Sequence, residues 1–303
     1  MSTTVSQHAE LQLRTAYSLC RGIARRAAKN FYYGFMLLPG QKRDALCAVY
    51  AFMRHADDLS DEPGMSSEER RRKLGEFIDS YHRAYESACV DDPVFLALKD
   101  AQLHYDIPMQ WLDQLVAGTG MDVQESSAAP GELEVVYPSF SDLYQYCYHV
   151  ASVVGLVCVK IFGYRDKKAE EYAEQLGIAF QLTNILRDVK EDAAMRRIYL
   201  PMEDLLRYQV TPTELGAGEP MEKLRPLLAF EAKRARDYYE SANKLLPLIE
   251  DASQPALWAM VEIYRGILDR IERKDYDVYT ERARLSTLNK LAVFVKGFGK
   301  RLL

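Results

Sequence analysis

Apolar residues recur at α-helical spacing along almost the whole chain, and this pattern constrains the fold more than any other feature. In residues 44–54 the apolar side chains leave only a narrow polar face, which indicates a buried helix. Glycine and proline, 16 and 12 among 303 residues, are too sparse to interrupt the pattern often. No segment shows strand alternation followed by a hairpin turn. The sequence therefore predicts an all-α protein.

Turn signals divide the pattern into separate helices. We expect helices at 8–28, 40–60, 66–89, 92–104, 108–117, 140–163, 166–193, 221–247, 254–272 and 285–299. Ser66 and Glu69 have the spacing of a capping box. The longer connectors 118–139 and 209–220 are flanked by strong helical signals, so neither resembles a domain linker. A single domain over residues 1–303 is expected.

Composition and charge exclude several classes of protein. The net charge is −5 at pH 7, so no basic excess points to a nucleic-acid partner. The five cysteines include no Cys-x-x-Cys pair, which argues against a disulfide framework or a zinc site and favours the cytoplasm. The N-terminal residues show no signal peptide. The longest apolar run, 150–159, is shorter than the roughly 20 residues that span a bilayer.

A first stripe of polar side chains lies on the predicted helix 40–60. Asp57 and Asp61 are four residues apart and so share one helix face. Arg54 and Tyr50 precede them on the same face. One such pair is, by itself, more often a solvated helix surface than a site.

A second stripe lies on the predicted helix 166–193, where Asn184, Asp188 and Asp192 follow one another at intervals of four residues. Gln181 lies one turn earlier. Both stripes occur on helices that otherwise look buried, and buried carboxylates need a partner. Oxygen ligands suit a hard cation such as Mg²⁺, which proteins commonly hold together with substrate phosphates. The spacing predicts a cavity between two helices that binds Mg²⁺ and a diphosphate; two solvated faces are the alternative.

At these residues the sequence resembles the squalene/phytoene synthase family. The matching motifs are DDLSD at 57–61, QLTNILRDVKED at 181–192, RIYLP at 197–201, YCYHVASVVG at 146–155 and NFYYGF at 30–35. The likeness extends from about residue 15 to 290. It implies the all-α isoprenoid synthase fold with a central cavity, and the head-to-head joining of two isoprenoid diphosphates.

The resemblance also implies residue roles. Magnesium would be bound by Asp57, Asp61, Asn184, Asp188 and Asp192. Diphosphate oxygens would pair with Lys29, Arg54 and Arg187, and the reacting carbons would lie beside Tyr50 and Tyr146. Further substrate contacts would come from Phe31, Phe35, Ala151, Val154, Gly155, Gln181, Tyr264 and one of Arg282 or Arg284. Ordinary core packing would account equally well for the aromatic and small residues of this set.

Two variations in the motifs bear on the reaction. Ser152, at a position where the family usually has glycine, and the NFYY segment at 30–33 resemble the bacterial presqualene diphosphate synthases of hopanoid and squalene pathways. This resemblance implies that two farnesyl diphosphates condense to presqualene diphosphate with release of diphosphate, and that downstream squalene-forming enzymes are partners.

Other activities stay open at this point. Within the family they are a complete NADPH-dependent squalene synthase and a phytoene or dehydrosqualene synthase. Outside it they are a terpene cyclase, a head-to-tail elongase, and an inactive relative that acts as an assembly factor. No Gly-x-Gly-x-x-Gly follows a strand, so NADPH is not expected as a cofactor, although squalene synthases bind it without this fingerprint.

The C-terminal segment from Leu285 is both apolar and basic. Its apolar face either packs against the rest of the protein or makes a peripheral contact with an anionic membrane.

Overall fold

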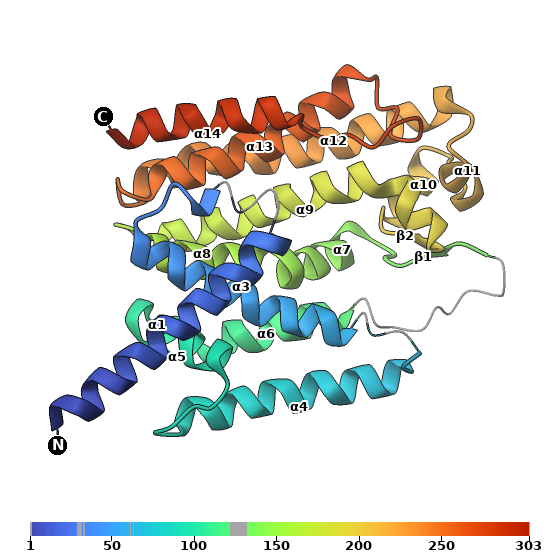
Figure 1. Cartoon of the computed structure of the whole chain (residues 1–303). Coiled ribbons are helices and arrows are strands. Elements are labelled where there is room, and N and C mark those ends of the chain that lie inside the picture. Colours follow the sequence, from blue (N-terminus) through green and yellow to red (C-terminus); the bar gives the residue numbers. More distant parts are fainter. Residues whose placement is uncertain are drawn as a thin grey trace.

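The structure is a computed structural model that describes residues 2–28, 32, 34–60, 62, 64–121 and 132–302, with side chains between 7 and 299. Its helices lie in layers, with α4 at one side of the molecule and α14 at the other (Figure 1). The buried apolar residues form one continuous core. The predicted all-α class is confirmed.

The helices are α1 (Ser2–Ala27), α3 (Gly40–Ser60), α4 (Ser67–Glu86), α5 (Pro93–Tyr105), α6 (Met109–Met121), α7 (Phe140–Cys147), α8 (Val153–Phe162), α9 (Lys168–Ala194), α10 (Met202–Arg207), α11 (Pro212–Ala217), α12 (Met221–Leu245), α13 (Gln254–Arg273) and α14 (Thr287–Leu302). Strand β1 (Glu134–Val135) pairs in parallel with β2 (Arg197–Ile198).

Most predicted helices appear within a few residues of their expected ends, and the capping box of Ser66 and Glu69 is formed. Several features differ. Helix α10 and the β1–β2 pair lie where no regular element was expected. Helix α1 begins six residues earlier than expected. Helix α11 lies inside the expected connector 209–220. Thr211 caps its N-terminus, and Gly218, whose φ of 77° favours glycine, follows its last residue. The expected helix 140–163 contains a π-helical segment, Tyr148–Ser152, between α7 and α8.

Helix α9 lies at the centre of the molecule and packs against α8, α12, α13 and the π segment (Figure 1). The backbone of α9 approaches the backbone of the π segment and of α8 closely. A Cβ at Gly177 would lie 2.5 Å from the Cα of Ser152, and one at Gly155 would lie 2.9 Å from the carbonyl oxygen of Ala173. The Ser152 hydroxyl also donates to the Glu174 carbonyl at 2.7 Å. Only glycine fits at these two crossings.

The continuous helix Phe140–Phe162 is long and apolar enough to cross a membrane, and half of its most apolar window is buried inside the protein. Since it packs against α9, it has the environment of a core helix. Among the described residues, no other helix meets this criterion.

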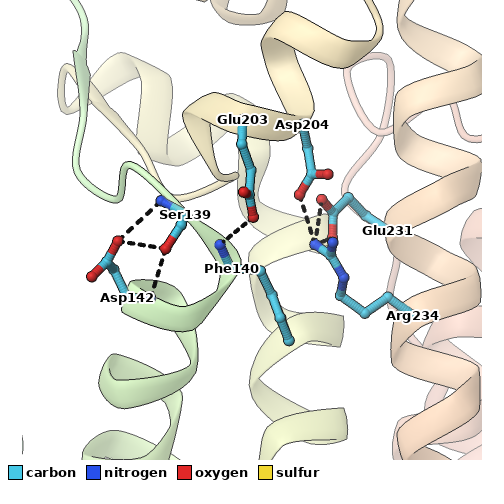
Figure 2. Close-up of polar contacts among 7 residues, drawn as sticks. All are labelled: Ser139, Phe140, Asp142, Glu203, Asp204, Glu231 and Arg234. Atoms are coloured by element: carbon cyan, nitrogen blue, oxygen red, sulfur yellow. Dashed lines mark hydrogen bonds and ion pairs between the residues drawn. The ribbon is translucent and has the colours of Figure 1, made fainter.

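A buried ion-pair cluster joins α10, α12 and the start of α7 (Figure 2). Arg234 donates to Asp204 at 2.8 Å and to Glu231 at 2.8 Å, and its guanidinium lies 4.0 Å from the ring centroid of Phe140. The backbone N–H of Phe140 donates to Glu203 at 2.7 Å. Burial raises the pKa of Glu231 to about 8, although the charge of Arg234 acts in the opposite direction.

We expect Gly177→Ala to destabilise the protein by about 1–3 kcal/mol, because its methyl group would collide with backbone that cannot rotate away. Urea unfolding measures the change. Gly75→Ala on α4 is the control. Its Cβ meets nothing within 4 Å, so helix propensity should make it neutral or stabilising by up to about 1 kcal/mol. If Gly177→Ala and Gly75→Ala were equally stable, the close approach of Gly177 to Ser152 would be contradicted.

The raised pKa of Glu231 predicts pH-dependent stability. Between its usual value of 4.5 and about 8, the folded state holds a proton that the unfolded state has released. The free energy of unfolding should therefore fall as pH rises through this window, by at most about 1.4 kcal/mol per pH unit. Glu231→Gln should flatten the curve, whereas Glu240→Gln, an exposed change on the same helix, should not. Parallel curves for all three proteins would refute the assignment.

Candidate active site

An apolar cavity of 240 Å³ lies between α3, α8, α9 and α13. The predicted site residues that line it are Phe35, Tyr50, Ala151, Val154, Gly155, Gln181, Asn184 and Tyr264. The structure thus brings together side chains from four segments far apart in the sequence. The π segment contributes Val150 and Ala151 to the wall.

The cavity has a polar end, at Gln181 and Asn184, and apolar walls beyond it. Helices α8 and α9 run antiparallel, with Gly155 beside Ala173 and Ser152 beside Gly177. The lining continues along α8 past the level of Ala173 to Phe162.

The two predicted aspartate stripes continue from the polar end. On α3, Tyr50 and Met53 line the cavity seven and four residues before Asp57. On α9, Gln181 and Asn184 line it seven and four residues before Asp188. This equal spacing places both aspartates on the cavity-facing sides of their helices, at the rim.

On the α3 side, Asp57 and Arg54 line a polar pocket of 360 Å³ that shares Met53 and Val150 with the apolar cavity. Arg54 is paired with Asp58. Arg70, Thr119 and His149 also line this pocket. None of them was predicted as a site residue, because residue spacing does not connect them to Asp57. Three predicted residues, Lys29, Phe31 and Asp61, lie outside the described residues.

On the α9 side, Asp188 is bound by two arginines. It accepts from Arg187 Nε at 2.8 Å and from Arg282 Nε at 2.7 Å. Burial alone would lower the pKa of Arg187, but the pair with Asp188 outweighs it and the pKa is raised. Asp192 lies one turn beyond Asp188 and is half-buried.

These arginines belong to a basic pocket of 710 Å³. Its charged lining residues are Arg25, Arg187, Arg282, Arg284 and Lys290. Burial, followed by repulsion from Arg284, lowers the pKa of Lys290. Such a concentration of positive charge next to an apolar cavity suits an anion such as a diphosphate. Arg25 and Lys290 carried no sequence signal, since they come from opposite ends of the chain.

The oxygen atoms at the rim fit a hard divalent cation. The side-chain oxygen of Asn184 is buried without a hydrogen-bond partner, and carboxylates lie one and two turns further along α9. Among the described residues, however, no three His, Cys, Asp or Glu side chains form a ready cluster. Oxygen atoms of a bound diphosphate would add to this set of ligands.

Aromatic rings border the polar end. Phe180 stacks on Tyr264 at a centroid distance of 4.2 Å, and burial raises the pKa of both Tyr50 and Tyr264, which keeps them neutral. Tyr146 packs against Tyr137 and Tyr199, each at 5.3 Å. It is not among the residues that line the apolar cavity, but lies one turn before Val150 on the same continuous helix.

Comparison with known proteins agrees with this geometry. The squalene/phytoene synthase model matches residues 24–289. The chain is 36% identical to the 15-cis-phytoene synthase of Synechococcus elongatus, covering 92% of this chain and 91% of that protein. It is 37% identical to the phytoene synthase of Mycobacterium tuberculosis, covering 93% and 90%.

Solved structures give the same result. A dehydrosqualene synthase in complex with ligand superimposes with a TM-score of 0.82 at 30% identity, covering 96% of this chain and 98% of that one. Squalene synthase HpnC from Alicyclobacillus acidocaldarius gives a TM-score of 0.79 at 26% identity, covering 88% and 96%. The all-α isoprenoid synthase fold, the motifs and the length of the match all indicate the same family. The chain therefore belongs to the squalene/phytoene synthase family of prenyltransferases.

Proposed function

We propose that this protein condenses two farnesyl diphosphates head to head to presqualene diphosphate, acting as one domain over residues 1–303. The observation that carries the proposal is an apolar cavity whose polar end is bordered by Asp57 and by Asp188 with its two arginines. Apolar walls suit prenyl chains, and the charged rim suits their diphosphates. Members of the family perform this type of condensation on isoprenoid diphosphates.

The choice of farnesyl diphosphate rests on the resemblance of Ser152 and of the NFYY segment at 30–33 to presqualene diphosphate synthases. Phytoene synthase is the second candidate, because the curated relatives described above carry that name.

The charged side chains at the rim would assist departure of the leaving group. The C–O bond of one substrate breaks, diphosphate leaves, and the allylic carbon bonds to the double bond of the second substrate. Arg54, Arg187 and Arg282 supply fixed positive charge for the diphosphate oxygens. Asp57, Asp61, Asn184, Asp188 and Asp192 would hold magnesium together with the diphosphates, and the metal would supply further charge neutralisation.

The cavity walls would protect the cation until the product forms. Phe35, Tyr50 and Phe180 present aromatic faces that stabilise positive charge and exclude water. Closing the cyclopropane ring releases one proton. Tyr50 and Tyr264 are neutral phenols, which accept protons poorly, and burial raises the pKa of both and so keeps them neutral. We therefore assign the role of proton acceptor to the released diphosphate.

Further parts of the proposal concern location and partners. We place the enzyme in the cytoplasm, with its C-terminal segment as the part that meets a membrane, and with squalene-forming enzymes downstream. The proposed reaction is redox-neutral and needs no NADPH.

Asp57→Ala and Asp188→Ala should each lower turnover at least about 100-fold, since each removes a carboxylate that would hold magnesium beside the leaving diphosphate. Far-UV circular dichroism should show unchanged helical content. Asp237→Ala, an exposed change on α12, serves as the control and should keep wild-type turnover. Full activity of the wild type in excess chelator would contradict the requirement for magnesium.

The product distinguishes the candidates. Purified protein is incubated with Mg²⁺ and either farnesyl or geranylgeranyl diphosphate, with NADPH added to half of each reaction. Presqualene diphosphate from farnesyl diphosphate, unchanged by NADPH, is expected. Squalene formed only with NADPH would indicate a complete squalene synthase, and a forty-carbon product formed only from geranylgeranyl diphosphate would indicate a phytoene synthase.

A further inference from the structure

The polar pocket on the α3 side of the active site contains two side chains that the proposed reaction does not use. Arg70, on the first turn of α4, and His149, in the π segment, both line this pocket. The other charged residues of its described lining are Arg54 and Asp57, so cations outnumber the one carboxylate. Arg70 lies outside the motifs that the chain shares with its family, in the basic run 70–73.

Arg70 differs from its neighbours in how its polar atoms are satisfied. Arg72 pairs with Glu76 at 2.6 Å, and Lys73 pairs with Glu62 at 3.0 Å. Among the described residues Arg70 has no acidic partner, and its guanidinium makes one hydrogen bond, of 3.3 Å, to the carbonyl oxygen of Glu62. Its Nε atom is buried and has no partner in the same set of residues. A buried donor without an acceptor costs free energy, so this position favours a ligand that accepts hydrogen bonds.

The ring of His149 is oriented by the segment that carries it. Its Nδ1 atom lies 2.8 Å from the carbonyl oxygen of Gln145, and a carbonyl only accepts, so Nδ1 donates the proton of this bond. Nε2 is therefore the nitrogen that can meet a ligand. Helix α6 fixes the same segment, since a Cβ at Gly118 would lie 2.9 Å from the carbonyl oxygen of His149. The π segment thus holds an imidazole at the pocket, and such segments are frequent at functional sites.

The polar pocket adjoins the apolar cavity. Met53 and Val150 line both spaces, so an anion in the pocket can stay attached to a prenyl chain in the cavity. The basic pocket around Arg284 differs in this respect, because its described lining shares no residue with the cavity. A diphosphate beside Arg70 therefore fits a substrate that still carries its chain.

We propose that Arg70 and His149 bind the diphosphate of a substrate whose prenyl chain lies in the apolar cavity. Arg70 donates from its guanidinium, and His149 donates from Nε2 as the imidazolium ion. This deepens the proposed function and rests on it in one respect, since the ligand is a prenyl diphosphate. Both side chains line the pocket on the α3 side, whereas Arg187 and Arg282 pair with Asp188 on the α9 side, so their role is in substrate binding.

Isothermal titration calorimetry of the full-length protein with Mg²⁺ and farnesyl thiolodiphosphate, a slowly ionising analogue with sulfur in place of the ester oxygen, tests the proposal. Arg70→Gln and His149→Phe should each raise the dissociation constant about tenfold. With farnesyl diphosphate, KM should rise by a similar factor while kcat stays nearly constant, which is the pattern of lost substrate binding. Arg70→Lys, which keeps the charge, should lie between Arg70→Gln and the wild type. Arg72→Gln, which changes a paired and 59% exposed arginine on the same helix, is the control and should bind like the wild type.

Two results would overturn the assignment: dissociation constants of Arg70→Gln and His149→Phe equal to that of Arg72→Gln, or a fall in kcat with an unchanged dissociation constant. The same titrations with geranylgeranyl thiolodiphosphate separate this question from the identity of the substrate. If the enzyme makes a forty-carbon product and the variants weaken binding of the geranylgeranyl analogue instead, the proposed reaction fails and the role of Arg70 and His149 stands.

Discussion

The fold depends on keeping one polar stripe inside an otherwise apolar bundle. Helix α9 is buried on most sides, yet along one side it carries Gln181, Asn184 and Asp188. Desolvated charge is costly, and here Arg187 and Arg282 compensate Asp188 while the cavity gives the other polar groups room. Helix α8 and the π segment approach α9 closely at Gly155 and Gly177. The cavity lies beside the polar stripe.

This arrangement explains why the charged groups are paired before any ligand binds. Asp188 with two guanidinium partners is neutralised locally, and the basic pocket around Arg284 and Lys290 retains an excess of positive charge. An entering diphosphate would compete with Asp188 for the same guanidinium groups. Binding of the anion and release of the carboxylate toward a cation would therefore be coupled through Arg187 and Arg282.

Much of this organisation could be predicted from local sequence patterns. The helices followed from apolar spacing, and the stripes of Asp57 and Asp188 from intervals of four residues. These signals lie within one or two turns of helix, where geometry is fixed by the backbone.

Features that depend on distant segments were missed. The basic pocket joins Arg25 to Lys290, and the cluster around Arg234 joins α10 to α12. The π segment at Tyr148–Ser152, which lies against Gly177 of α9, has no residue spacing that distinguishes it from an α-helix. Residue spacing cannot reveal such contacts before the helices are placed.

The antiparallel pair α8 and α9 has a further consequence for how this family diversifies. One helical turn advances about 5.4 Å along the axis, and one isoprene unit lengthens an extended chain by about 5 Å. Moving the apolar end of the cavity by a single turn would therefore change its capacity by one isoprene unit. The charged rim at Asp188, about four turns along α9 from Ala173, would remain untouched. Product size can thus evolve in whole isoprene steps through substitutions at the floor, independently of the residues that handle the diphosphate.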